Sequence, residues 1–204
     1  MSAWAPEVEE RARGLVARYP EPRSALGPLL YLAMRHDGGI TEEGMRRVAE
    51  LTGTTPAQVQ SVASFYTMYK AAPGRYLISV CTSISCHLLG GEEVLAAVEE
   101  EAGAAAGETD AGGLFTVERA ECLGACGGAP ALQVNYENVE GVTPEQASAL
   151  CRRLREARPA VVRSDSLQEE FGGTRAFDWG PEEAAGAVAP VPSFEPYGTA
   201  GVEA

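Results

Sequence analysis

The feature that most constrains this chain is a set of four cysteines arranged in two pairs. Cys81 and Cys86 form a C-x4-C pair in the segment CTSISC, and Cys122 and Cys126 form a C-x3-C pair in CLGAC. A short apolar or β-branched run precedes each pair, YLISV before the first and LFTV before the second. Such runs predict β-strands. The sequence therefore predicts two loops at strand ends that present four thiolates, the donor set of a metal centre.

The spacing within each pair bears on the kind of centre. Structural zinc sites usually use C-x2-C knuckles, whereas C-x4-C spacing occurs in 2Fe–2S proteins. A thioredoxin-type dithiol needs C-x-x-C, which this sequence lacks. A Rieske centre needs two histidine ligands, and neither His36 nor His87 stands in a C-x-H arrangement. The spacing favours an all-cysteine 2Fe–2S cluster and leaves a zinc site, or disulfides and free thiols, as alternatives.

The cysteines lie within longer recognisable segments. CTSISC is followed by HLLGGEEVL, then by ECLGACGGAPALQVN and VTPEQ, while ALGPLLYLA and VASFYTMY stand upstream. Over about residues 5–157 the chain resembles the thioredoxin-like 2Fe–2S subunit of NADH:quinone oxidoreductase, which is respiratory complex I. Paralogous subunits of NAD-reducing hydrogenases and NAD-dependent formate dehydrogenases carry the same cysteine pattern. The stretch NYENVEG departs from the family, being slightly short where a tight hairpin is usual.

The resemblance implies an α+β fold, with an N-terminal helical bundle followed by a thioredoxin-like 2Fe–2S ferredoxin domain. It implies that Cys81, Cys86, Cys122 and Cys126 hold one 2Fe–2S cluster. The implied function is that of a one-electron carrier beside a flavin-bearing, NADH-oxidising subunit, in the cytoplasmic peripheral arm of a membrane-bound complex. The alternatives are the equivalent subunit of a hydrogenase or formate dehydrogenase and, from another class, a zinc-stabilised interaction module.

We expect three parts along the chain. Residues 1–72 carry four amphipathic helical patterns, and residues 73–158 carry a β-α-β-β-β-α pattern. Residues 159–204 form an acidic tail that we expect to be disordered, because its pattern has no strand or helix period. Aromatic side chains in that tail, Phe171, Phe177 and Trp179, are candidates either for anchoring on a partner or for local packing. In the first part, VASFYTMY fits either a core stripe or a docking surface.

Composition and missing motifs exclude several functions. A net charge of −13 argues against nucleic-acid binding, and no apolar run approaches the ~18 residues of a membrane span. The N-terminus lacks the pattern of a secretory signal, so five cysteines indicate metal or redox use in a reducing compartment.

The sequence has neither G-x-G-x-x-G nor a Walker loop, so we expect no catalytic residue and no NADH or flavin site. Hydride chemistry then belongs to a partner, for which the helical part is the expected docking piece. The fifth cysteine, Cys151, is expected to be a small core residue.

Overall fold

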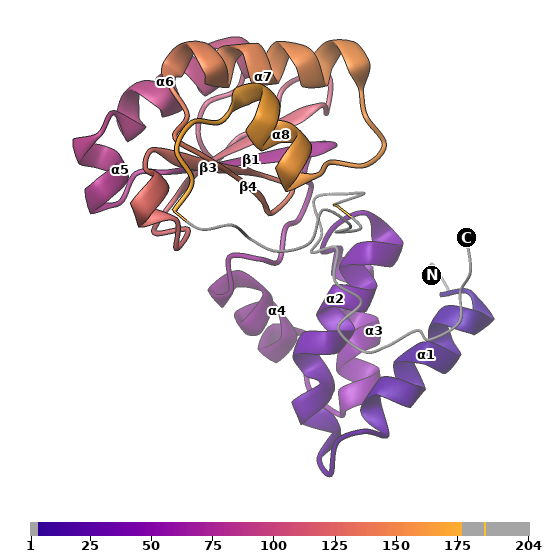
Figure 1. Cartoon of the computed structure of the whole chain (residues 1–204). Helices are drawn as coiled ribbons and strands as arrows, with labels where there is room; N and C mark the ends of the chain where they lie inside the picture. Colours follow the sequence, from indigo (N-terminus) through magenta and orange to yellow (C-terminus); the bar gives the residue numbers. More distant parts are fainter. Residues whose placement is uncertain (1–3, 177–185, 187–204) are drawn as a thin grey trace. The chain divides into compact units, whose positions relative to one another are not determined.

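The computed structural model describes residues 4–176 and residue 186. The chain divides into two compact units between Ala72 and Pro73, and each is described by itself (Figure 1). None of the helices in this described part is long and apolar enough to cross a membrane.

The first unit is made of helices. Its elements are α1 (Pro6–Val16), the 3-10 helix η1 (Pro22–Ala25), α2 (Leu26–Asp37), α3 (Glu42–Thr52) and α4 (Pro56–Phe65). Two of these helices begin at threonine caps: the Thr41 hydroxyl accepts the Gly44 N–H, and Thr55 forms a capping box with Gln58. The apolar faces meet in one core built around Leu29, Leu30, Val48 and Val59.

The second unit is built on a four-stranded mixed sheet. Its strands are β1 (Tyr76–Cys81), β2 (Phe115–Ala120), β3 (Ala131–Val134) and β4 (Glu137–Glu140), in the order β2-β1-β3-β4. β1 pairs parallel with β2, and β3 pairs antiparallel with β1 and β4. All six residues of β1 are buried, as expected for a central strand covered on both faces.

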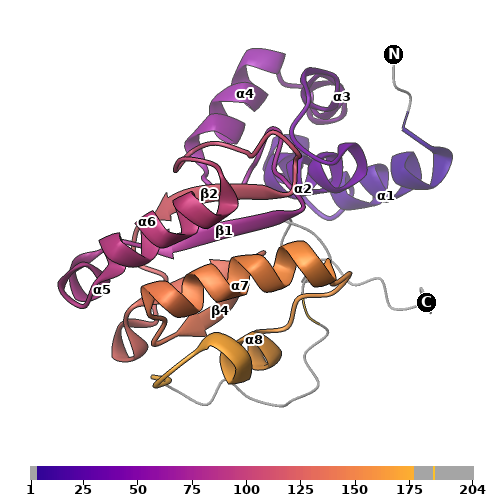
Figure 2. The ribbon, with the colours of Figure 1, turned by 90° about the horizontal axis from the view of Figure 1, so that it is seen from above.

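Helices and one tight turn complete this α+β unit. α6 (Gly91–Ala102) and α7 (Pro144–Ala157) pack against each other over the sheet (Figures 1 and 2). α7 begins at a capping box between Thr143 and Gln146. Asn135 and Tyr136, both with positive φ, join β3 to β4 in the two-residue hairpin that type I′ turns allow. The stretch NYENVEG therefore still closes a tight hairpin.

The expectation of disorder from residue 159 on is wrong for its first part. Residues Ser164–Phe171 form a helix, α8, which lies beside α7 and β4 (Figure 1). Its Leu167 and Phe171 are buried in the same core as the sheet, together with Val162 before the helix. Phe171 therefore packs locally, whereas Phe177 and Trp179 lie outside the described residues.

The polar groups of α8 and the residues that follow cover the open edge of β4. Ser164 Oγ donates to the Asn138 carbonyl at 2.6 Å, and Gln168 Oε1 accepts the Glu140 N–H at 2.8 Å. The Glu140 carbonyl accepts from Gln168 Nε2 at 3.0 Å and from the Gly173 N–H at 2.8 Å. An edge strand otherwise exposes unpaired backbone groups, so this segment completes the sheet.

Candidate metal centre

The parallel pairing of β1 and β2 brings the two cysteine loops together. Cys81 is the last residue of β1, and the register places it opposite Ala120, the last residue of β2. Since parallel strands end at the same edge of a sheet, the loop carrying Cys86 and the loop carrying Cys122 start side by side. The first loop forms a short helix, α5 (Ile84–Leu88), where the sequence pattern predicts a plain loop.

Contacts between side chains tie the cysteines of these loops into pairs. The Sγ atoms of Cys122 and Cys126 lie 3.4 Å apart, and Cys81 lies close enough to Cys86 to help raise the pKa of its thiol. Ser85 on α5 acts to lower the pKa of Cys126, so the first loop lies beside the second. Cys126 opens the 3-10 turn η2 (Cys126–Gly128). The structure therefore brings all four predicted ligands to one edge of the sheet, as two pairs.

The two pairs differ in their surroundings. Cys81 and Cys86 are buried at 3% and 2% exposure in a small apolar cluster with Ala125 and Ala131. Cys122 and Cys126 are exposed, and so are Glu121, Gly124 and Gly127 beside them, whereas Leu123 is partly buried and Ala125 and Gly128 are buried. A group held by both pairs would be shielded from water on one side and reachable from solvent on the other.

The thiol pKa values follow from these surroundings. Burial, and then the hydrogen bond with Cys81, raise the pKa of Cys86 to about 11. The Gly124 N–H, 3.4 Å from the Cys122 sulfur, stabilises the thiolate and lowers the pKa of Cys122. The hydrogen bond to Cys122 raises the pKa of Cys126, because one thiolate disfavours a second beside it. Gly124 reaches its position with φ of 82°, which glycine adopts without strain.

Cys151 lies apart from this group in the packing of the domain. It is fully buried on α7 within the core of the sheet and its helices, whereas Cys81 and Cys86 belong to a separate apolar cluster. Burial raises the pKa of Cys151 to about 12, so this thiol stays protonated. These surroundings are those of a small core residue.

The donor set fits a two-iron cluster. In an all-cysteine 2Fe–2S centre four thiolates are shared between two irons, so two pairs of sulfurs are needed. The contacts between the sulfurs are pairwise, and Cys81, Cys86, Cys122 and Cys126 are all free of disulfides.

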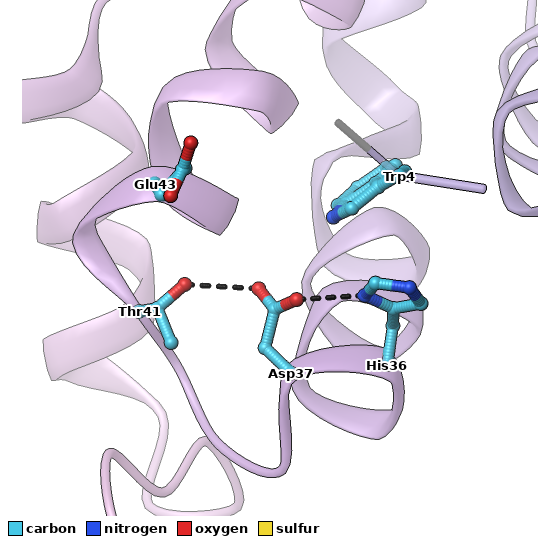
Figure 3. A pocket seen from close by; sticks show the side chains of 5 residues that line it. All are labelled: Trp4, His36, Asp37, Thr41 and Glu43. Carbon is cyan, nitrogen blue, oxygen red and sulfur yellow. Dashed lines mark hydrogen bonds and ion pairs between the residues drawn. The ribbon is translucent and has the colours of Figure 1, made fainter. Parts of the chain in front are cut away.

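The histidines take no part in these contacts between cysteines. His36 lines a hollow of about 340 Å³ in the helical unit, with Trp4, Asp37, Thr41 and Glu43 (Figure 3). Its Nδ1 lies 2.7 Å from one Asp37 oxygen, and Thr41 Oγ1 donates to the other at 2.9 Å. These bonds join the end of α2 to the start of α3. His87, on α5, has its Nδ1 3.7 Å from Glu92.

Comparison with known proteins assigns the family. The sequence model of the thioredoxin-like [2Fe-2S] ferredoxin family matches residues 12–155. The chain belongs to this family. Membership of the thioredoxin-like ferredoxins confirms the predicted fold class and implies one 2Fe–2S cluster.

Individual relatives of this thioredoxin-like ferredoxin are subunits of larger complexes. It is 41% identical over 153 residues to an NADH-quinone oxidoreductase subunit of Mycobacterium tuberculosis (strain H37Rv), covering 74% of this chain. The match takes in 61% of that relative's length, so the chain spans under two thirds of it. Identity to NADH-quinone oxidoreductase subunit 2 of Thermus thermophilus is 43% over 143 residues, 68% of this chain and 79% of the relative.

The fold also occurs in a solved enzyme. An NAD+-reducing [NiFe]-hydrogenase in the air-oxidized state matches with a TM-score of 0.61 at 21% identity, over 75% of this chain and 27% of that chain. At that identity the likeness shows the shared fold alone.

Sequence reasoning found the four cysteines but missed two pieces of the structure around them. The first is α5, which is only five residues long and so gives no helical period. The second is α8, for which the signal was present: Leu167 and Phe171 are four residues apart, as on one face of a helix.

Proposed function

We propose that this chain is the one-electron carrier subunit of an NADH:quinone oxidoreductase, in which its cluster exchanges electrons with the flavin of a partner NADH-oxidising subunit. The gathering of Cys81, Cys86, Cys122 and Cys126 at one sheet edge carries this proposal. Relatives at 41–43% identity, which are named as NADH-quinone oxidoreductase subunits, favour this complex over a hydrogenase. The place that goes with this function is the peripheral arm of the complex, on the cytoplasmic face of the membrane.

Each part of the site has a role in holding such a centre. The four cysteines are the proposed ligands, and the bound cluster supplies a one-electron redox couple. Ala125 and Ala131 keep water from Cys81 and Cys86, the inner pair of ligands. The Gly124 N–H stabilises negative charge on the Cys122 sulfur, and hydrogen bonds of this kind to cluster sulfurs help to set the reduction potential.

A surface for the electron-donating partner lies on the outer side of α5. Ile84 and Leu88 are 78% and 76% exposed, and they share one face of the helix because they are four residues apart. Leu89, the C-cap, is also exposed. Cys86, on the same helix, is buried. A protein seated on these apolar side chains would therefore lie one helix thickness from a proposed ligand. We accordingly propose the docking site here, while the exposed Phe65 and Tyr66 of VASFYTMY keep the helical unit as a second candidate.

The charges around α5 indicate the chemistry of that partner. Glu93 and Glu121 are exposed near the two ends of the cysteine loops, and a Glu93 oxygen lies close to Gly90, next to Leu89. Arg119 is paired with Glu92, so its charge is mostly engaged by that carboxylate and only partly offsets Glu121. A flavoprotein with an apolar hollow and a basic rim would complement this surface.

Leu88→Asp is expected to weaken binding of the purified flavoprotein subunit by about tenfold or more, because it places a charge at the centre of an apolar contact. Phe65→Asp tests the other candidate surface in the same way, since Phe65 of VASFYTMY is equally exposed at 76% at the end of α4 in the helical unit. Binding would be measured by calorimetry at several salt concentrations, with the affinity of the wild type falling as salt rises. Equal affinities for Leu88→Asp and the wild type, or weakening by Phe65→Asp alone, would contradict the proposed surface.

The isolated chain is expected not to oxidise NADH, although its cluster takes up one electron. The four-thiolate set is complete, but the sequence has no motif for holding a dinucleotide or flavin phosphate. An anaerobic titration of the purified chain, first with NADH and then with dithionite, checks this. Bleaching by NADH alone would show a hydride-accepting site in this chain. A dithionite-reduced sample that contains iron but lacks a spin-half resonance signal would refute the proposed function itself.

A further inference from the structure

The last residue of β4 places a buried carboxylate behind the second cysteine loop. Glu140 is 1% exposed, and its Oε2 accepts the backbone N–H of Ala176 at 2.7 Å. Its backbone N–H and carbonyl bond to Gln168 of α8, and the carbonyl also accepts the Gly173 N–H. One residue thus joins the sheet edge, α8 and the segment after α8.

The same segment packs against the turn that carries Cys126. A Cβ added to Gly128 would clash with the Glu140 carboxylate and lie 2.7 Å from the Thr174 carbonyl oxygen. A Cβ on Gly127 would lie 2.9 Å from the Cβ of Ala176. Both glycines belong to η2, which begins at Cys126. The backbone of this turn is therefore in close contact with residues 174–176.

Further bonds fix this segment to the domain. The Gly141 N–H donates to the Gly128 carbonyl at 2.6 Å, and Arg175 Nη2 donates to Asp165 on α8 at 2.7 Å. Cys126 itself is exposed and lies at the start of a single 3-10 turn, so its position depends on what the turn rests against. Cys86, in contrast, is enclosed in an apolar cluster.

We propose that Glu140 and residues 173–176 form a brace that positions the Cys126 sulfur toward the cluster. The proposal rests on Cys126 being a ligand, as in the proposed function. Glu140 is then a positioning residue that acts through Gly128, and the segment after α8 belongs to the metal centre. Loss of the brace would disturb the outer pair of ligands, Cys122 and Cys126, and leave Cys81 and Cys86 in place.

The test compares Glu140→Ala with Glu140→Gln, whose amide oxygen can still accept the Ala176 N–H. Val98→Ala is the control for simple destabilisation, because Val98 is fully buried on α6 and away from the turn. The holoproteins would be compared by paramagnetic resonance of the dithionite-reduced cluster, by the rate of bleaching in a chelator, and by Tm. Glu140→Ala is expected to shift the g-values and to speed cluster loss by about tenfold, the usual effect of removing a supporting group behind a metal ligand.

Glu140→Gln is expected to restore most of the wild-type spectrum, and Val98→Ala to lower Tm with the spectrum unchanged. If Glu140→Ala only lowers Tm, with wild-type g-values and bleaching rate, the brace has no positioning role and the proposal is wrong. Gly128→Ala, which pushes the turn away from Thr174, gives a second independent variant that should change the spectrum in the same way. A wild-type protein without any cluster signal would instead refute the proposed function, so the two failures are distinguishable.

Discussion

Replacement of Cys81, Cys86, Cys122 or Cys126 by alanine, one at a time, is expected to abolish stable cluster binding, whereas Cys151→Ala is expected to leave it intact. An all-cysteine 2Fe–2S centre has no spare protein ligand, so an iron that loses one of its two thiolates is open to solvent. Iron content should fall from about two per chain to near zero in the four ligand variants.

Iron and acid-labile sulfide in the anaerobically purified proteins check this expectation, with the visible spectrum as a second readout. Cys151→Ala is the matched control, since it also removes a thiol but from the core of α7. The Cys151→Ala substitution leaves a small cavity in the core, so the protein should lose stability without losing iron. Full iron and sulfide content after loss of any one of the four cysteines would remove that residue from the ligand set. Zinc in place of iron would support the interaction module that the sequence left open.

Several strands and helices of the second unit were predictable because each is encoded by a short run of neighbouring residues. The apolar run that ends at Cys81 gives β1 directly, and Thr143 with Gln146 gives the start of α7. The convergence of the two cysteine loops follows from the parallel pairing of β1 and β2, which the structure shows. The order of the strands could not be read from periodicity alone, because pairing depends on contacts between distant segments.

The tail was misjudged for a physical reason. Residues 160–204 are acidic, and most of their apolar residues do not recur at a helix or strand period. α8 is stable because Leu167 and Phe171 enter a core made by earlier elements, and because Gln168 bonds to the edge of β4. Neither partner is visible within the tail itself. Glu140 was missed likewise, since only the fold shows that this carboxylate is buried beside the second cysteine loop.

Truncation after Pro159 is expected to destabilise the second unit severely. It removes the buried side chains of Val162, Leu167 and Phe171, and loss of a buried phenylalanine side chain alone costs about 3–5 kcal/mol. It also leaves the backbone groups of Asn138 and Glu140 without their partners from α8. Domains are stable by only about 5–15 kcal/mol, so these losses together approach the whole free energy of unfolding. At about 4–8 °C per kcal/mol, Tm should fall by more than about 10 °C.

Truncation after Ala176 is the matched control, because it retains α8, the brace and every contact described for the second unit up to that residue. The Tm values of the two truncated holoproteins and of the full chain would be measured by calorimetry or circular dichroism. We expect the longer form to keep its cluster and to melt well above the shorter form, and the shorter form to lose its cluster as the sheet edge opens. If the shorter form melts like the longer one, α8 contributes no stability. If both melt far below the full chain, residues beyond 176 carry the stabilising contacts.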